Sequence, residues 1–275
     1  MGVEIRVGIT DWGVARTACA VGVHPLLMSA NRLYNHKRGE FRDVTRECHS
    51  GVALDSAGFV AMKLYGGYPW SMDAYASLGA LHPWDWWAAM DYCCEPEIAA
   101  DRAEVRQRVE RTADSLAMLR ATVDGLLWEG ASWATYPMPV LQGWDVDDYR
   151  RSVELTDRVL GGDWPPMVGI GSVCRRHLRG RAGVLRIFGA VAAAVPSTTR
   201  LHLFGVKSGA LGHLASHPQM GSIDSCAYDM AARWESCTNG TPNTNAHRAR
   251  HLNQWVAKQR GAVAAAQETR QGSLL

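Results

Sequence analysis

Short apolar runs, each separated from the next by a polar or helical stretch, recur along this chain and constrain its fold more than any other feature. The expected strands lie at residues 24–30, 51–56, 86–93, 138–144, 166–172, 200–207 and 221–226. Helical patterns cover residues 97–128, 145–160 and 181–195. Strands that alternate with helices form parallel sheets, and seven or eight such units predict an α/β fold of the TIM-type (β/α)8 barrel class.

The sequence predicts a single domain over residues 1–275, because no long repeat and no Pro- or Ser-rich linker divides it. Residues 3–9, "VEIRVGI", are expected to add an extra N-terminal strand or hairpin. The composition changes after about residue 235. Residues 235–275 are therefore expected to form a C-terminal extension, in which an irregular loop precedes a helix packed on the side of the barrel.

Composition and charge exclude several classes of protein. The longest apolar runs are shorter than the roughly 18 residues of a membrane span, and the N-terminus lacks a signal-peptide pattern. We therefore expect a cytoplasmic protein without a membrane partner. The net charge of +2 excludes a polycation, although basic residues cluster at 175–181 and 247–251, either as solvated faces or as a phosphate-binding surface. Seven cysteines without a disulfide spacing favour reduced thiols.

Tryptophan is unusually frequent, with eleven residues, and four of them lie between residues 70 and 87. Such a group of rings is typical of a core or of a contact between subunits, and it can also stack on bases. The sequence leaves these three interpretations open, and with them the formation of a homodimer.

Polar residues and glycines close most of the expected strands, namely Asp55, Asp91, Gln142, Gly171, Gly205 and Asp224. Any one of these acids could be a helix N-cap, since Asp accepts the free N–H groups of a first turn. Barrel enzymes, however, place their active sites at the carboxyl ends of the strands. Recurrence in successive units therefore favours a shared site.

Three carboxylates around one cavity suit displacement at an anomeric carbon, where one attacks carbon and another handles the proton of the leaving group. The leaving group could be a sugar or a base. Gln142 beside Asp91 favours a base, because an amide and a carboxylate complement the carbonyl and N–H groups of a purine edge. Phe59 and Phe204 could enclose a flat ring, or be ordinary core residues.

At these residues the sequence resembles the tRNA-guanine transglycosylase superfamily, whose barrels exchange guanine for a 7-deazaguanine. "LDSAGF" resembles the DSGG-aromatic motif, "AMDYC" the Asp-x-Cys strand end, and "VLQGW" the QGG motif. "VGIGS" resembles the glycine-rich strand, "LHLFGV" the LMGVG motif, and "IDSCAY" the archaeal-type FDSAAY motif. The order and spacing agree from about residue 50 to 230, about two-thirds of the chain.

The resemblance implies a role for each matched residue. Asp224 would be the nucleophile and Asp55 the general acid and base. Phe59 and Phe204 would form the two faces of a base sandwich. The remaining residues would recognise the base, namely Asp91, Gln142, Gly143, Gly171, Ser172 and Gly205. The implied chemistry needs no cofactor.

The departures from the superfamily pattern are also informative. The tRNA enzymes carry a C-x-C-x-x-C…H zinc site after the nucleophile strand and a C-terminal RNA-binding domain, and this chain shows neither pattern. "MDYCCEPE", "GIGSVCRR" and "LHLFGVK" look closer to the short branch of phages and genomic islands, which inserts 7-deazaguanines such as 7-cyano-7-deazaguanine into DNA. The expected partners are a free 7-deazaguanine and DNA, as a duplex with a flipped guanine or single-stranded, in the cytoplasm of a bacterial host.

Three alternatives remain at the level of sequence. The chain could be a tRNA transglycosylase without the accessory domain, or a non-catalytic relative that binds nucleic acid. It could also be a glycoside hydrolase barrel. The presence of both Asp55 and Asp224 disfavours an idle subunit, and Gln142 with the glycine-rich strand disfavours a glycosidase.

A structural zinc site is a further hypothesis. His247 and His251 are four residues apart, so a helix would place both imidazoles on one face, with Cys237 within reach and Cys226 as a fourth ligand. The spacing is looser than in known structural sites. In the alternative interpretation both histidines are exposed on a basic helix that contacts phosphate.

Overall fold

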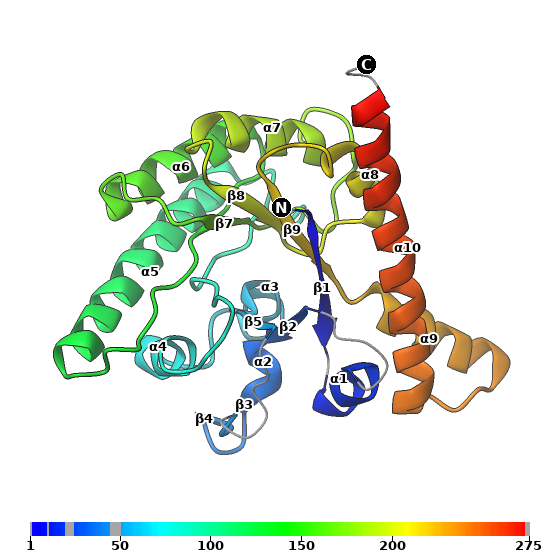
Figure 1. Ribbon diagram of the computed structural model, residues 1–275. Coiled ribbons are helices and arrows are strands. Elements are labelled where there is room, and N and C mark those ends of the chain that lie inside the picture. The colour runs from blue at the N-terminus through cyan, green and yellow to red at the C-terminus, as the bar shows by residue number, and fades with distance from the viewer. Residues whose placement is uncertain (1, 10, 20–24, 45–50, 273–275) are drawn as a thin grey trace.

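The computed structural model describes residues 2–9, 11–19, 25–44 and 51–272, so residue 24 of an expected strand and residues 273–275 of the expected extension lie outside it. Its centre is a seven-stranded parallel sheet in the order β5-β2-β1-β9-β8-β7-β6. The sheet curls into a half-barrel with helices around its outer side (Figure 1). The α/β class predicted from the sequence is confirmed. The strands are β1 (Glu4–Ile9), β2 (Leu26–Ser29), β5 (Val52–Asp55), β6 (Val140–Leu141), β7 (Met167–Ile170), β8 (Arg200–Leu203) and β9 (Met220–Ser225).

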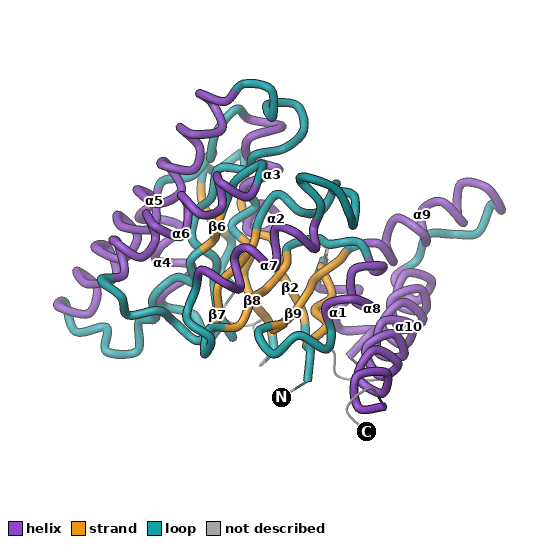
Figure 2. Tube along the Cα trace, turned by 90° about the horizontal axis from the view of Figure 1, so that it is seen from above, coloured by secondary structure: helices purple, strands orange, loops and turns teal. Residues whose placement is uncertain are grey.

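Helical segments follow the strands along the chain and cover the sheet from the outside, as the view from above shows (Figure 2). They are α1 (Trp12–Cys19), α2 (Ala30–Leu33), α3 (Gly58–Val60), the π-helical turn η1 (Ala61–Tyr65), α4 (Met72–Ala80), α5 (Arg102–Trp128), α6 (Val146–Leu160), α7 (Val184–Ala194), the 3-10 turn η2 (Ser208–Ala210), α8 (Leu211–Leu214), α9 (Ala227–Asn239) and α10 (Asn245–Gly272). A small hairpin of β3 (Tyr34–Asn35) and β4 (Glu40–Phe41) lies outside the main sheet.

Local sequence signals determine where the longer helices begin and end. Asp145 accepts hydrogen bonds from the N–H groups of Asp147 and Asp148, which completes a capping box at the start of α6. The same helix ends at Gly161, whose φ of 61° is favourable for glycine. At the start of α5, the side chain of Asp101 accepts hydrogen bonds from the N–H groups of Ala103 and Glu104. These signals explain why the predicted ends of α6 agree with the structure to within a residue.

The two edges of the seven-stranded sheet are linked by a short extended segment. Leu54 of β5 pairs in parallel with Trp87, and Ala88 pairs in parallel with Met138, just before β6. The Ala88 N–H donates to Leu54 O at 2.8 Å, and the Met138 N–H donates to Trp87 O at 2.7 Å. The expected strand at 86–93 is thus reduced to two bridges, and the arrangement is compatible with a barrel.

Two predictions made from the sequence are confirmed in part. Residues 3–9 contribute the expected N-terminal strand, β1, but this strand lies inside the sheet, paired in parallel with both β2 and β9. The expected loop after residue 235 begins later than predicted, since α9 continues to Asn239. Residues 240–244 separate α9 from α10, which is the expected C-terminal helix. The period-3.6 pattern of α9 was obscured by the polar composition of its second half.

Large aromatic and aliphatic side chains fill the core on the outer side of the sheet. Trp70, Trp84 and Trp87 are buried together with Tyr75 and Leu54, which confirms the core interpretation for these three rings. A second cluster lies beneath α6 and α7, around Ile170 and Leu203. None of the helices among the described residues is both long and apolar enough to cross a bilayer.

Candidate active site

A cavity of about 490 Å³ opens at the carboxyl ends of the strands, within the usual size range of small-molecule pockets. The predicted residues that line it are Asp55, Phe59, Asp91, Gln142, Gly171, Ser172, Phe204, Gly205 and Asp224. Gly143 does not line the cavity. It packs against α6 instead, where an added Cβ would lie 2.7 Å from the Cβ of Asp148. The strand ends thus bring nearly all of the predicted residues together.

Asp224 is the penultimate residue of β9, and its side chain is largely buried. Its Oδ1 accepts a hydrogen bond of 2.7 Å from the backbone N–H of Gly205, a residue in the left-handed region with φ of 62°. Among the residues that the structure describes, no hydrogen-bond donor contacts Oδ2. The carboxylate is therefore held through one oxygen, while the other is available to the cavity.

His202 of β8 also faces this carboxylate. Its Nε2 lies 3.3 Å from Asp224 Oδ1 and makes no hydrogen bond, while its Nδ1 lies 2.7 Å from Ser222 Oγ. In an enzyme without substrate, hydrogen bonds between catalytic groups are often longer than they are during the reaction. Sequence reasoning missed His202, although strand alternation placed it on the same face as Phe204.

Asp55 ends β5, and its Oδ2 accepts a hydrogen bond of 3.1 Å from the N–H of Ala57. The residue is partly exposed to the cavity, but protein atoms surround its carboxyl group. Burial raises its pKa from 3.8 to about 8, and the nearby charges of Asp91 and Asp224 act in the same direction. A pKa of about 8 means that most Asp55 carboxyl groups carry a proton at neutral pH.

Asp91 and Gln142 form the centre of a buried hydrogen-bond chain. Asp91 Oδ1 accepts from Ser56 Oγ at 2.6 Å, and Oδ2 accepts a short hydrogen bond from Gln142 Nε2. Gln142 Oε1 in turn accepts from Ser172 Oγ at 2.6 Å. Burial raises the pKa of Asp91, whereas its hydrogen bonds lower it. These hydrogen bonds fix the fully buried side chain of Gln142. The second amide N–H of Gln142 stays available for another partner.

Backbone geometry explains two features of the motifs that surround these hydrogen bonds. An added Cβ at Gly171 would lie 2.1 Å from Gln142 Nε2, so only glycine permits the amide to approach this strand end. Ala57 has φ of 64° and Ser172 has φ of 53°, a region that costs most residues about 1 kcal/mol or more. Such strain occurs at functional sites, and both residues line the cavity.

Phe59 and Phe204 lie on different elements and both contribute to the cavity wall. The guanidinium of Arg175 and the ammonium of Lys63 lie 5.5 Å and 5.4 Å from the centre of the Phe59 ring. The centres of the Phe204 and His202 rings are 4.5 Å apart, and the two ring planes are nearly perpendicular. Neither ring is fully buried, and their use as the two faces of a base sandwich stays a prediction.

The two basic clusters are largely occupied by internal contacts. Arg176 is buried and donates to four backbone carbonyls, those of Gly143, Trp144, Ser172 and Ala182. Arg248 is buried against Asp229 and Asp11. These two arginines belong neither to a solvated face nor to a phosphate-binding surface. The exposed members, such as Arg179 and Arg181, keep both interpretations open.

The predicted metal ligands lie in three different places. His247 and His251 are indeed close together on α10, but their neighbour is Glu235 of α9, and Cys237 is exposed outside this group. Cys226 lines the cavity, with its Sγ 3.4 Å from Gly8 O. His247 is buried, so the alternative of two exposed histidines is wrong for this residue.

Comparison with known proteins identifies the family. A search of curated proteins found no match. The family model described as "DeoxyPurine in DNA protein A" (DpdA) matches residues 4–273, nearly the whole chain, and so includes the strands, the cavity and α10. The chain therefore belongs to the DpdA family, a DNA-guanine transglycosylase family related to tRNA-guanine transglycosylase.

Proposed function

We propose that this protein exchanges guanine in DNA for a 7-deazaguanine base through a covalent bond between Asp224 and the sugar. The observation that carries the proposal is the position of Asp224 and Asp55 on one cavity, together with the Asp91–Gln142 pair. A glycosidic exchange needs a nucleophile, a proton carrier and a base-recognition surface, and these residues provide all three.

In the first step, Asp224 Oδ2 attacks C1′ of the target deoxyribose while the C1′–N9 bond to guanine breaks. The proton of the Asp55 carboxyl group passes to the departing purine, so guanine leaves as a neutral base. Asp55 is then an anion. The raised pKa of Asp55 suits this step, because the group enters it protonated.

In the second step, the incoming 7-deazaguanine occupies the emptied cavity. Its N9 proton returns to the Asp55 carboxylate, N9 attacks C1′, and the bond to Asp224 breaks. Two inversions at C1′ give net retention, as in retaining glycosidases. One glycosidic bond replaces another, so the exchange balances without a redox cofactor or a nucleoside triphosphate.

Base recognition is assigned to Asp91, Gln142, Gly171 and Ser172, with Phe59 and Phe204 on the two faces of the ring. The second amide N–H of Gln142 is suited to a purine carbonyl. Asp91 would accept from the purine N–H groups beside the bonds it already accepts from Ser56 and Gln142. The protein thus presents fixed polar groups before the base arrives.

The target guanine must leave the DNA stack to reach Asp224, which costs a few kcal/mol in a duplex. Arg32 and Leu64 are exposed where they line the cavity, and Lys63 is exposed beside Phe59. These side chains are suited to hold a phosphate or to fill the gap left by the flipped base. We further propose that residues 85–89 take the place of the eighth strand of a (β/α)8 barrel. This segment would hold Asp91 at the same end of the barrel as the other acids.

The decisive experiment compares acceptor nucleic acids. The protein is incubated with labelled guanine, 7-cyano-7-deazaguanine or other 7-deazaguanines and with duplex DNA, single-stranded DNA or unmodified tRNA. We expect label in DNA and none in tRNA. Asp224→Ala serves as the inactive control. Incorporation into tRNA alone would favour the tRNA transglycosylase alternative, and no incorporation into either would favour a non-catalytic relative.

A further inference from the structure

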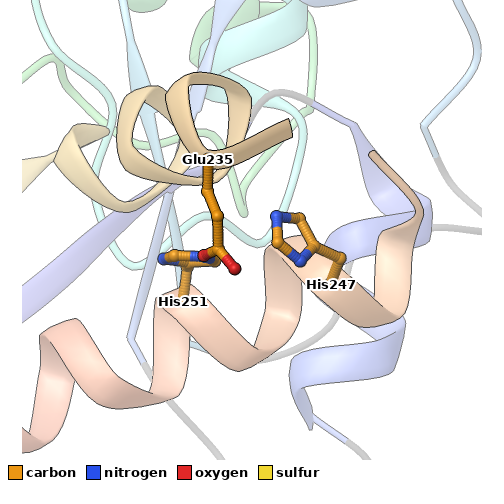
Figure 3. Close-up of side chains that lie close together, drawn as sticks. All are labelled: Glu235, His247 and His251. Atoms are coloured by element: carbon orange, nitrogen blue, oxygen red, sulfur yellow. The ribbon is translucent and has the colours of Figure 1, made fainter. Parts of the chain in front are cut away.

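Glu235, His247 and His251 gather between α9 and α10 (Figure 3), and none of them lines the cavity. Glu235 extends from α9 toward two imidazoles that lie on one face of α10. One ligand atom from each of the three residues lies within 4.8 Å of the others. We propose that these side chains bind a structural zinc ion that joins the two helices, whether or not the exchange reaction proposed above is correct.

His247 is already oriented for metal binding. The side chain is buried, and its Nε2 lies 3.1 Å from the carbonyl oxygen of Ala232. Because a carbonyl can only accept, Nε2 carries the hydrogen and Nδ1 retains its lone pair. A hydrogen bond from the distal ring nitrogen to a carbonyl is the usual outer contact of a metal-bound histidine.

Arg250 shows that these acceptors converge on a positive charge. Its Nη2 lies 3.0 Å from His247 Nδ1 and 3.3 Å from Glu235 Oε1. A guanidinium has donors only, so it stands where a cation would be held. The Arg250 side chain is 54% exposed and can turn into solvent when a metal takes its place.

The donor set suits zinc. Imidazole nitrogens and a carboxylate oxygen bind Zn²⁺ at about 2.0–2.2 Å, which corresponds to about 3.3 Å between ligand atoms in a tetrahedron. His251 Nε2 donates to Glu235 Oε2 at 2.6 Å, so zinc would displace this hydrogen, either to Nδ1 of the same ring or to solvent. A small opening there and a small closure toward His247 then complete three positions. Water would occupy the fourth. Cys237 is two residues after Glu235, about 200° around α9, and is directed away from the group.

The position of the site indicates a structural role. α9 follows β9, the strand that carries Asp224, and α10 packs against α1, α8, α9 and β1. The ion pair between Asp229 and Arg248, at 2.6 Å, joins α9 to α10 near the sheet. Zinc at Glu235 would join the same two helices farther along α9, and thereby fix their angle at two points.

Elemental analysis of untagged protein provides the first test. We expect close to one equivalent of zinc, its loss in His251→Gln, and its retention in His213→Gln, which changes an exposed histidine of α8. Binding to His251→Gln should weaken at least about 100-fold, because even loss of an outer contact costs roughly 10–100-fold. Co²⁺ in place of zinc should give the visible absorption of a tetrahedral site, which does not depend on base exchange.

The variant Arg250→Gln distinguishes a zinc site from a cluster that is held together only by the charge of Arg250. If zinc replaces the guanidinium, this exposed substitution should strengthen metal binding, and zinc should then raise the melting temperature more than it does in the parent. Metal-free parent protein that neither binds added Zn²⁺ nor gives the Co²⁺ spectrum would overturn the proposal. Full zinc content in His251→Gln would overturn it as well, while loss of exchange activity alone would bear only on the proposed function.

Discussion

His202 Nε2 lies 3.3 Å from Asp224 Oδ1, and among the described residues this buried ring nitrogen makes no hydrogen bond. Ser222 Oγ lies 2.7 Å from the opposite ring nitrogen, and in the tautomer in which Nδ1 accepts from this hydroxyl, Nε2 carries the hydrogen. An Nε2–H group directed at Oδ1 would orient the carboxylate together with the Gly205 N–H. We interpret His202 as a residue that positions the nucleophile.

His202→Phe should therefore lower kcat by roughly 100-fold, the scale expected when a reacting group is displaced by about 1 Å. KM for the free base should change little, because His202 is fully buried behind the cavity wall. His202→Gln, which can place an amide N–H near Oδ1, should recover part of the rate. A similar loss in both variants, with a raised KM, would show that the residue only supports the fold.

Asp224→Asn tests the nucleophile with little change in shape. The amide oxygen can still accept from Gly205, so we expect folding to be retained while exchange falls at least about 10⁴-fold, since no carboxylate remains to attack C1′. The parent protein should form a covalent DNA adduct on a denaturing gel when guanine is removed, and the variant should not. A covalent adduct between DNA and the Asp224→Asn variant would show that another residue is the nucleophile.

The strand ends could be predicted from the sequence because parallel strands followed by helices bring their carboxyl ends to one side. Asp55 and Asp224 were found in this way, and both line the cavity. The central position of β1 was not predicted, because local patterns do not specify which strands pair. Likewise, the segment at 86–93, where sequence alone indicated a full strand, forms two isolated bridges, at Trp87 and Ala88, and a few flanking backbone hydrogen bonds.

Contacts between distant residues account for the functional details that sequence reasoning missed. Glu235 is twelve residues before His247, and only the packing of α9 on α10 brings it to the imidazoles. The predicted ligand Cys237 has a more typical zinc-binding side chain, but helix geometry directs it elsewhere. Gly143 matches a motif, yet its backbone packs on α6 rather than on the cavity.

Gln142→Leu should weaken binding of guanine and 7-deazaguanine. The substitution removes the donor to Asp91 and the acceptor for Ser172, and each buried polar group left unpaired costs roughly 1–3 kcal/mol. Gln219→Leu is the matched control, because Gln219 is also buried and bonded, but to carbonyls of Pro196 and Thr199. Both variants should lose stability in urea, and only Gln142→Leu should lose base affinity in calorimetry. Equal affinities would remove Gln142 from base recognition.

Asp55→Asn should change how both activity and stability depend on pH. Burial, with the charges of Asp91 and Asp224, raises the Asp55 pKa to about 8 from 3.8 in the unfolded chain. Between these values the folded protein holds a proton that the unfolded chain has released, so the stability contributed by Asp55 is fully present below the lower value and is lost as pH rises through about 8. Asparagine cannot ionise and does not show this loss.

Urea unfolding at about pH 6 and about pH 9 measures the effect, and we expect the free energy of unfolding to fall more in the parent than in Asp55→Asn. The exchange rate of the parent should also fall above about pH 8, because the first step needs a protonated Asp55. Tyr136 is exposed and does not line the cavity, so the control variant Tyr136→Phe should have a pH profile like that of the parent. If the free energy of unfolding changes equally with pH in the parent and in Asp55→Asn, Asp55 ionises normally. Asp55 would then not be the group that protonates the departing guanine.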